Sequence, residues 1–339
     1  MVDVAIAAPR GRGKSRAWVS RLQLRELVLL PVIILAMIAG AIVNPSFLTA
    51  DNLINILQQC SELSILVIAE SLILMCGMFD LSLESIVGFC PMLAAWLIVA
   101  DTTEGGSGFG LNGFVAIALV LVAGAVIGAF NGFLVVRLKL NAFIATLAML
   151  ILLRGTTIGM TNGRTLFDLP PEFLYLGSAT WFGIPVSIWI AGFLYLIFGL
   201  LLRYHRLGRA LYAIGGNPEA ARIAGIPVER ITWGVFALAG LLAALAGLML
   251  TGRIASVVAS QGQNLIFYVF AAAVIGGISL NGGQGRLLGA LTGVILLGIL
   301  QNVLTLSQIA AFWIDAAYGA IILLSLIVTR FTGEAPRRA

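Results

Sequence analysis

Side chains that could carry out catalysis are few in this chain, and they are not paired. The single histidine, His205, lies in an arginine-rich segment, which leaves no histidine-ligated metal site and no ordinary serine–histidine dyad. Cys60, Cys76 and Cys90 lie in or beside apolar stretches and form no CxxC pair, which is typical of small apolar side chains rather than of metal ligands or disulfides. The sequence therefore predicts a protein that is not an enzyme and holds neither metal nor cofactor.

A stretch that resembles a phosphate-binding loop occurs near the N-terminus, Ala8-Pro9-Arg10-Gly11-Arg12-Gly13-Lys14-Ser15. A functional phosphate loop follows a strand and opens a helix, because a parallel sheet must hold its backbone amides on the phosphates. Here the neighbours are a basic tail and then an apolar segment. We interpret residues 1–25 as a basic cytoplasmic tail, and we expect no ATPase site in this chain.

Two polar, glycine-containing segments interrupt the apolar stretches. The first, 76–85, carries Asp80 and Ser82, which either serve a function at membrane depth or cap the next helix. The second, 274–285, contains clustered glycines that favour close backbone approach or a helix break. These predicted structural glycines are Gly276, Gly277, Gly282 and Gly283. Both segments share an apolar run, glycine, Ser-Leu and a polar turn, which suggests an internal repeat.

Composition indicates what these segments are embedded in. Hydrophobic residues make up 60% of the 339 residues and charged residues 10%, against roughly 25% charged in soluble domains. A helix needs about 20 apolar residues to cross a bilayer. On that template we predict an all-α polytopic membrane protein with about ten transmembrane helices, some short or broken at glycines. The candidates are 26–44, 63–79, 85–100, 113–136, 142–160, 183–202, 231–251, 265–280, 287–304 and 309–329.

Basic residues orient these spans. With the N-terminus inside, seventeen of the Lys and Arg residues fall on the cytoplasmic side, and only Arg164 and Arg253 fall in outer loops. The outer loops carry acidic residues instead, including Glu62. Both termini are therefore expected in the cytoplasm. The predicted organisation is a tail at 1–25, a transmembrane domain at 26–330 and a second tail at 331–339. The net charge of +5 reflects this topology, not a nucleic-acid partner.

Three charged residues remain in the interior of the predicted spans: Glu70, Arg154 and Asp315. Intramembrane charges usually pair, so a structural Glu–Arg pair is favoured over a site that binds a polar substrate.

The longest cytoplasmic segment, 203–230, contains a short helix with clear boundaries. Asn217 can cap its start, Pro218 suits the first turn, Glu219 favours the positive end, and Gly225 can close it. An exposed helix of this kind either docks into a partner or is an ordinary capped loop helix.

Five stretches, in collinear order over most of the chain, resemble permease subunits of bacterial ABC importers of the ribose, xylose, arabinose and galactose type. They are NPSFLTADNLINIL (44–57), GMFDLSLES (77–85), FNGFLVVRLKLNAFIATLAMLILLRG (130–155), LGRALYAIGGNPEAARIAGI (207–226) and AVIGGISLNGGQGRLLGALTG (273–293). The segment with AIGGNPEAARIAGI is the most specific of them.

The resemblance implies an inner-membrane subunit that pairs with a second permease copy or a close relative. Two ATPase subunits would bind ATP and dock on the cytoplasmic face, and a periplasmic or lipid-anchored binding protein would deliver the sugar. The coupling residues it implies are Gly215, Gly216, Asn217, Pro218, Glu219, Ala220, Ala221, Arg222 and Gly225. For the substrate pathway we expect Gln58, Asp80, Ser82, Asn131, Asn141 and Phe143, which offer hydrogen bonds and an apolar face.

The chain departs from the family pattern at Met78, Phe79 and Glu84, and at 264–267, which lacks the usual acidic residue. These departures leave the identity of the sugar open. A permease for branched-chain amino acids or nucleosides and an ion-coupled secondary transporter are the alternatives.

Overall fold

The computed structural model describes residues 29–100, 102–310 and positions 312, 313, 316, 319, 320 and 323. The regular secondary structure of this part of the chain is helical, apart from a two-stranded antiparallel ribbon, β1 (Thr180–Trp181) and β2 (Ile184–Pro185), and an isolated β-bridge between Leu166 and Val257. The helices are α2 (Leu30–Val43), α3 (Ala50–Met75), α4 (Leu83–Ile98), α5 (Gly113–Val136), α6 (Ala142–Thr161), α7 (Pro171–Ser178), α8 (Val186–Tyr204), α9 (Arg206–Gly216), α10 (Pro218–Ile223), α11 (Val228–Ile254), α12 (Leu265–Ile275) and α13 (Leu287–Leu306).

Six of the described helices, α3, α5, α6, α8, α11 and α13, are long and apolar enough to cross a membrane. The apolar helices α2, α4 and α12 are shorter. Nine of the predicted spans overlap one of these helices, while 309–329 lies largely outside the described residues, as do Asp315 and the tail at 1–25. The chain is thus a helical, multi-pass membrane protein.

The predicted second span, 63–79, was wrong at its start, because α3 begins at Ala50 and runs for 26 residues. Polar side chains in its first half hid the span. In the fold these side chains have partners: Asn52 and Asn302 of α13 exchange amide hydrogen bonds of 3.0 and 2.8 Å. A polar residue is tolerated in a membrane helix when it is paired inside the bundle.

The helices α4 and α12 are the interrupted ones, as the short glycine-rich segments predicted. At 11 residues α12 spans about 16 Å, well under the roughly 30 Å of a hydrocarbon core. The two helices start close together inside the bundle. Gly262 lies shortly before α12 and Glu84 lies in the first turn of α4, and a methyl group on Gly262 would lie only 2.2 Å from the carbonyl oxygen of Glu84. Their positive N-terminal ends therefore face a common region.

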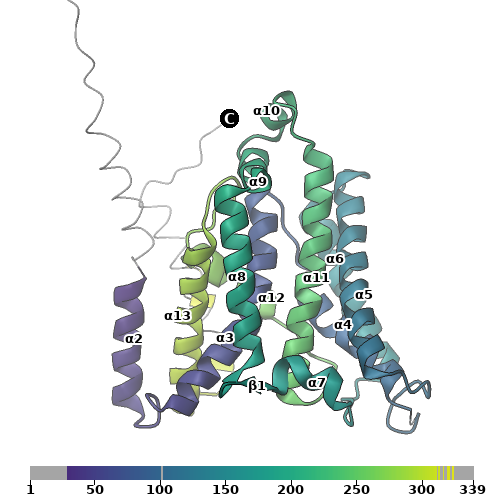
Figure 1. Cartoon of the computed structure of the whole chain (residues 1–339), viewed down its shortest axis with the longest axis vertical. Helices are drawn as coiled ribbons and strands as arrows, with labels where there is room; N and C mark the ends of the chain where they lie inside the picture. The colour runs from purple at the N-terminus through teal and green to yellow at the C-terminus, as the bar shows by residue number, and fades with distance from the viewer. Residues whose placement is uncertain are drawn as a thin grey trace, which may run out of the picture.

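Helix α11 is at the centre of the bundle, packed against α3, α4, α5 and α7 (Figure 1). Its contact with α5 relies on glycine: a methyl group on Gly240 would lie 2.2 Å from the carbonyl oxygen of Gly124. Small residues let membrane helices approach at this range. The outer faces of α5 and α6 instead expose large apolar residues such as Val126 and Ile151, which suits lipid or a second subunit.

The two ends of the bundle differ. Helices α9 and α10 form one end, and α7 with the β1–β2 ribbon lies at the other (Figure 1). No helix was predicted between residue 202 and Asn217, yet α9 lies there and contains Gly215 and Gly216 in its last turn.

Candidate functional site

A cavity lined by both polar and apolar side chains lies between α3, α4, α11, α12 and α13. Its volume is about 130 Å³. Its polar side chains come mainly from α3 and α11, and its apolar wall comes from all five helices. The lining residues are Gln59, Cys60, Glu62, Leu63, Leu66, Val87, Ala246, Leu250, Arg253, Leu265, Tyr268, Gly298 and Gln301.

An ion pair between α3 and α11 lies in this cavity. Arg253 donates from Nε to Oε1 of Glu62 at 2.7 Å and from Nη2 to Oε2 at 3.0 Å, a bidentate arrangement. Glu62 is 8% exposed and the Arg253 side chain 27% exposed. The expectation that both residues lie in outer loops was wrong. They belong to helices, and each compensates the charge of the other inside the bundle.

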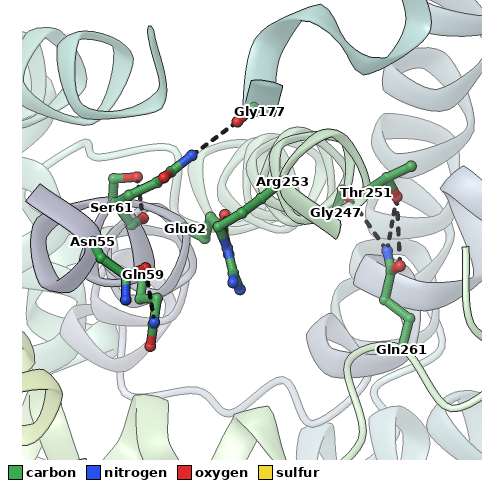
Figure 2. A network of polar contacts seen from close by, with 10 residues as sticks. Asn55, Gln59, Ser61, Glu62, Gly177, Gly247, Thr251, Arg253 and Gln261 are labelled. Atoms are coloured by element: carbon green, nitrogen blue, oxygen red, sulfur yellow. Dashed lines mark hydrogen bonds and ion pairs between the residues drawn. The ribbon is translucent and has the colours of Figure 1, made fainter. Parts of the chain in front are cut away.

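A second set of hydrogen bonds fixes the walls around the pair. Figure 2 shows Glu62 and Arg253 between Gln59 on one side and Gln261 with Thr251 on the other. The amide nitrogen of Gln261 donates to the carbonyl oxygen of Val87 at 3.0 Å and to Thr251 at 3.1 Å. It therefore ties α4 and α11 to the segment that leads into α12. These bonds connect the helices that surround the cavity.

The predicted pathway residues fall in three places. Asp80, Ser82 and Asn131 are fully buried and bonded together: the Ser82 hydroxyl donates to Asp80 at 2.6 Å, and Asn131 donates to Ser82 Oγ at 2.7 Å. They fasten the start of α4 to α5 and do not line the cavity. Gln58 points away from it and donates to the carbonyl oxygen of Gly177 at 2.9 Å.

Asn141 and Phe143 lie apart from this group, at the start of α6. Asn141 caps that helix, accepting from the Ile144 amide at 3.2 Å, and Phe143 is 46% exposed. The structure thus brings three of the six predicted pathway residues together and leaves the other three separate.

The intramembrane charges pair differently from the expectation. Arg154 of α6 is hydrogen-bonded to Glu84, not to Glu70. The other oxygen of Glu84 accepts from the backbone amide of Ile266, at 3.3 Å, in the first turn of α12. The carboxylate thus lies where the positive ends of α4 and α12 meet, a favourable position for a negative charge. Glu70 is fully buried, and among the residues that the structure describes neither of its oxygens has a hydrogen-bonding partner.

At the end of the bundle opposite α7 and the β1–β2 ribbon, α10 has the boundaries that the sequence predicted. Asn217 Oδ1 accepts from the Ala220 amide at 3.0 Å, and Gly225 follows the helix at φ +81°. Arg222 joins α10 to α11: its Nη1 lies 2.6 Å from Glu219 and its Nη2 lies 2.6 Å from Glu229. These hydrogen bonds, to Glu229 and then Glu219, raise the pKa of Arg222. Apart from Ala221, the helix is exposed.

Glycines connect this end to the interrupted helices. A methyl group on Gly215 would lie 1.9 Å from the carbonyl oxygen of Met75 and 2.3 Å from the amide nitrogen of Gly283. The Gly283 amide donates to that carbonyl at 3.0 Å. Gly282 packs on Gly77 in the same place. We call this contact of α9 with the end of α3 and the 276–286 turn the glycine junction.

Two other predicted glycines lie at the beginning of that turn. A methyl group on Gly276 would lie 2.4 Å from the carbonyl oxygen of Gly289, so this glycine allows close contact with α13. Gly277 has a φ of +84°, which favours glycine. Tyr212 of α9 also reaches the turn and donates to the carbonyl oxygen of Gly285 at 2.9 Å. The turn is thus held by α9 on one side and α13 on the other.

Within the described residues, no three His, Cys, Asp or Glu side chains cluster in a way that could hold a metal ion. Sequence reasoning also missed Gln59, Glu62, Arg253 and Gln301. One signal was present in α3: Gln59, Glu62 and Leu66 recur at helical spacing and share one face. No local signal connects that face to Arg253, 191 residues away.

Comparison with known proteins places the chain in a family. Residues 52–327 match the family model described as the permease component of branched-chain amino acid transport systems. The ribose import permease protein RbsC of Escherichia coli K12 is 36% identical over 318 residues, which cover 93% of this chain and 95% of that protein.

Other relatives have similar coverage. RbsC of Bacillus subtilis 168 is 36% identical over 292 residues, 86% of this chain and 88% of that protein. The L-arabinose transport system permease protein AraH of Escherichia coli K12 is 35% identical over 311 residues, 91% of this chain and 92% of that protein. No solved structure matches the chain. The chain belongs to the permease family of ABC importers that includes these ribose and arabinose permeases, as the sequence motifs predicted.

Proposed function

We propose that this chain is the permease subunit of an ATP-driven importer that carries a monosaccharide of the pentose or hexose class across the bacterial inner membrane. The observation that carries the proposal is the linkage of two sites. A cavity that contains polar side chains of α3 and α11 lies inside the bundle, and α10 projects from one end, tied to α11 through Arg222. Its relatives are named for ribose and L-arabinose, which supports the substrate class.

The coupling segment would receive the ATPase subunits. An exposed, capped helix held by an ion network can be pushed as a unit, and the glycine junction passes the displacement to the end of α3 and to the 276–286 turn. ATP would be bound by these partner subunits, with no cofactor in this chain. Both termini would be cytoplasmic, and a substrate-binding protein would deliver the sugar at the end formed by α7 and β1.

The cavity would form part of the pathway, and a second permease copy, identical or closely related, would complete it. Alternating access would expose the cavity first to one side and then to the other. The interrupted helices suit this movement, because half-helices end within the bundle and can shift without moving a full span.

Reconstitution of the complete importer tests the proposal. Uptake of a labelled pentose or hexose should require ATP and should stop when the ATPase subunits carry an inactivating Walker substitution. Continued uptake with inactive ATPase subunits would contradict the ATP-driven mechanism. Ligand-binding measurements on the partner binding protein would identify the sugar.

The coupling role has its own test. Glu219→Arg and Gly225→Leu should lower substrate-stimulated ATPase activity without affecting membrane insertion, because the first breaks a contact of Arg222 and the second strains a residue at φ +81°. Glu104→Arg, exposed in the loop between α4 and α5, is the matched control. Normal coupling in both variants would remove the docking role.

A branched-chain amino acid is the competing substrate. The family description names it, and the opposite charges of Glu62 and Arg253 could each bind one end of a zwitterion. In the structure the two charges instead satisfy each other. Competition for uptake by leucine, with no competition by pentoses or hexoses, would favour the amino acid.

A further inference from the structure

Among the described residues that line the cavity, two are charged, Glu62 and Arg253, and their opposite charges compensate each other. Their bidentate contact engages both carboxylate oxygens and two of the five N–H donors of the guanidinium. Donors of Arg253 and lone pairs of Glu62 therefore remain for a ligand. The cavity thus has strong hydrogen-bonding groups but no net charge.

The other polar lining groups are neutral. Gln59 and Gln301 carry amides and Tyr268 a phenol, while Leu63 and Leu66 form an apolar surface. A hydroxyl group can donate to the carboxylate and accept from the guanidinium at once. An anionic ligand would be attracted by Arg253 but repelled by Glu62, which lies in direct contact with it.

We propose that the Glu62–Arg253 pair sets the charge selectivity of this cavity, so that it accepts uncharged polyhydroxylated molecules and rejects sugar acids and sugar phosphates. The inference deepens the proposed function and rests on it for the class of ligand. Without the carboxylate of Glu62, the same cavity would hold an uncompensated guanidinium and would attract anions.

Cys60 provides a probe already in place. It is a free cysteine that lines the cavity two residues before Glu62, but it is buried and its Sγ lies 3.7 Å from the carbonyl oxygen of Val294. Gln59→Cys, at a half-buried lining position, supplies a second and more accessible thiol, at which the same rates are measured if neither reagent modifies Cys60. The assembled importer would be treated with anionic and cationic methanethiosulfonates of similar size, and modification of Cys60 would be followed by mass spectrometry. A free thiol in solution calibrates the intrinsic reactivity of the two reagents.

Glu62→Gln should raise the anionic-to-cationic rate ratio at Cys60 by about 10-fold or more, because a unit charge within several ångströms of a partly buried site has an effect of this size. Arg253→Gln should lower the ratio by a similar factor, and the double variant should return it to the wild-type value. Asp51→Asn, exposed in the first turn of α3, is the control and should leave the ratio unchanged.

Protection experiments address the ligand directly. A neutral monosaccharide should slow modification of Cys60 in the wild type, and a sugar acid of the same size should do so only in Glu62→Gln. The comparison of the two sugars in the wild type needs no substituted protein. It therefore still tests the proposal if Glu62→Gln prevents assembly.

Unchanged ratios in both single variants, or equal protection of the wild type by acid and neutral sugar, would each overturn the proposal. Sugar uptake is measured separately. If the importer shows the expected modification ratios but takes up no sugar with ATP, the proposed function is refuted and the charge selectivity of the cavity stands.

Discussion

Two adjacent glycines in the last turn of α9 are expected to respond oppositely to the same substitution. A methyl group at Gly215 would lie 1.9 Å from the carbonyl oxygen of Met75 and 2.3 Å from the amide nitrogen of Gly283. Both are backbone atoms, so neither can rotate aside. At Gly216 nothing lies within 4 Å of the added methyl group.

The magnitude follows from these contacts. Gly215→Ala should destabilise the permease by about 2 to 4 kcal/mol, because overpacking of a close contact costs about 1 to 3 kcal/mol and the 3.0 Å hydrogen bond from Gly283 to Met75 is lost with it. Gly216→Ala should be neutral or stabilising by up to about 1 kcal/mol, the helix preference of alanine over glycine.

Thermal and denaturant unfolding of the purified importer in nanodiscs would measure both variants, together with the ATPase stimulation produced by loaded binding protein. Gly215→Ala should also reduce that stimulation, since the glycine junction joins α9 to α3 and to the 276–286 turn. Equal effects of the two substitutions, or a larger loss from Gly216→Ala, would refute the role assigned to the junction.

Three further substitutions test separate contacts. Arg222→Ala should lower ATPase stimulation with unfolding unchanged, because it releases the exposed α10 from α11; a changed unfolding curve would contradict this. Glu84→Ala should cost about 3 kcal/mol in denaturant unfolding, since it leaves Arg154 unpaired and the Ile266 amide without its acceptor; a loss under about 1 kcal/mol would argue against the pair. The free energy of unfolding of Glu70→Gln should stay within about 1 kcal/mol of the wild-type value, because neither oxygen of Glu70 has a described partner to lose. Glu70→Lys should instead fail to assemble, as measured by gel filtration, because it buries an unpaired charge.

Local signals were sufficient for part of the fold. The spans at 113–136 and 142–160 agree with α5 and α6 to within one residue, because long apolar runs are read directly from composition. The cap at Asn217 and the closing turn at Gly225 were also predictable, since both depend on residues within one helical turn.

The span that begins at Ala50 was not predictable in the same way. Its polar residues would be too costly for a membrane helix that stood alone, and they become acceptable only through partners from distant helices, such as Asn302 for Asn52. Hydropathy along the chain contains no information about such partners. The preference for pairing charges was sound, but the identity of the partner of Arg154 was decided by packing.

By itself, the sequence determined that this protein is a multi-pass helical membrane protein, that a capped helix lies between Asn217 and Gly225, and which permease family its motifs resemble. The tertiary structure alone decided that Glu62 meets Arg253 in one cavity, that Glu84 lies between the starts of α4 and α12, and that Gly215 contacts Met75 and Gly283. The physical reason is the distance along the sequence over which each interaction acts. Hydropathy and capping act within a few residues, whereas each of these contacts joins helices far apart in the sequence, where the energies of charge burial and close backbone packing apply only once the helices have assembled.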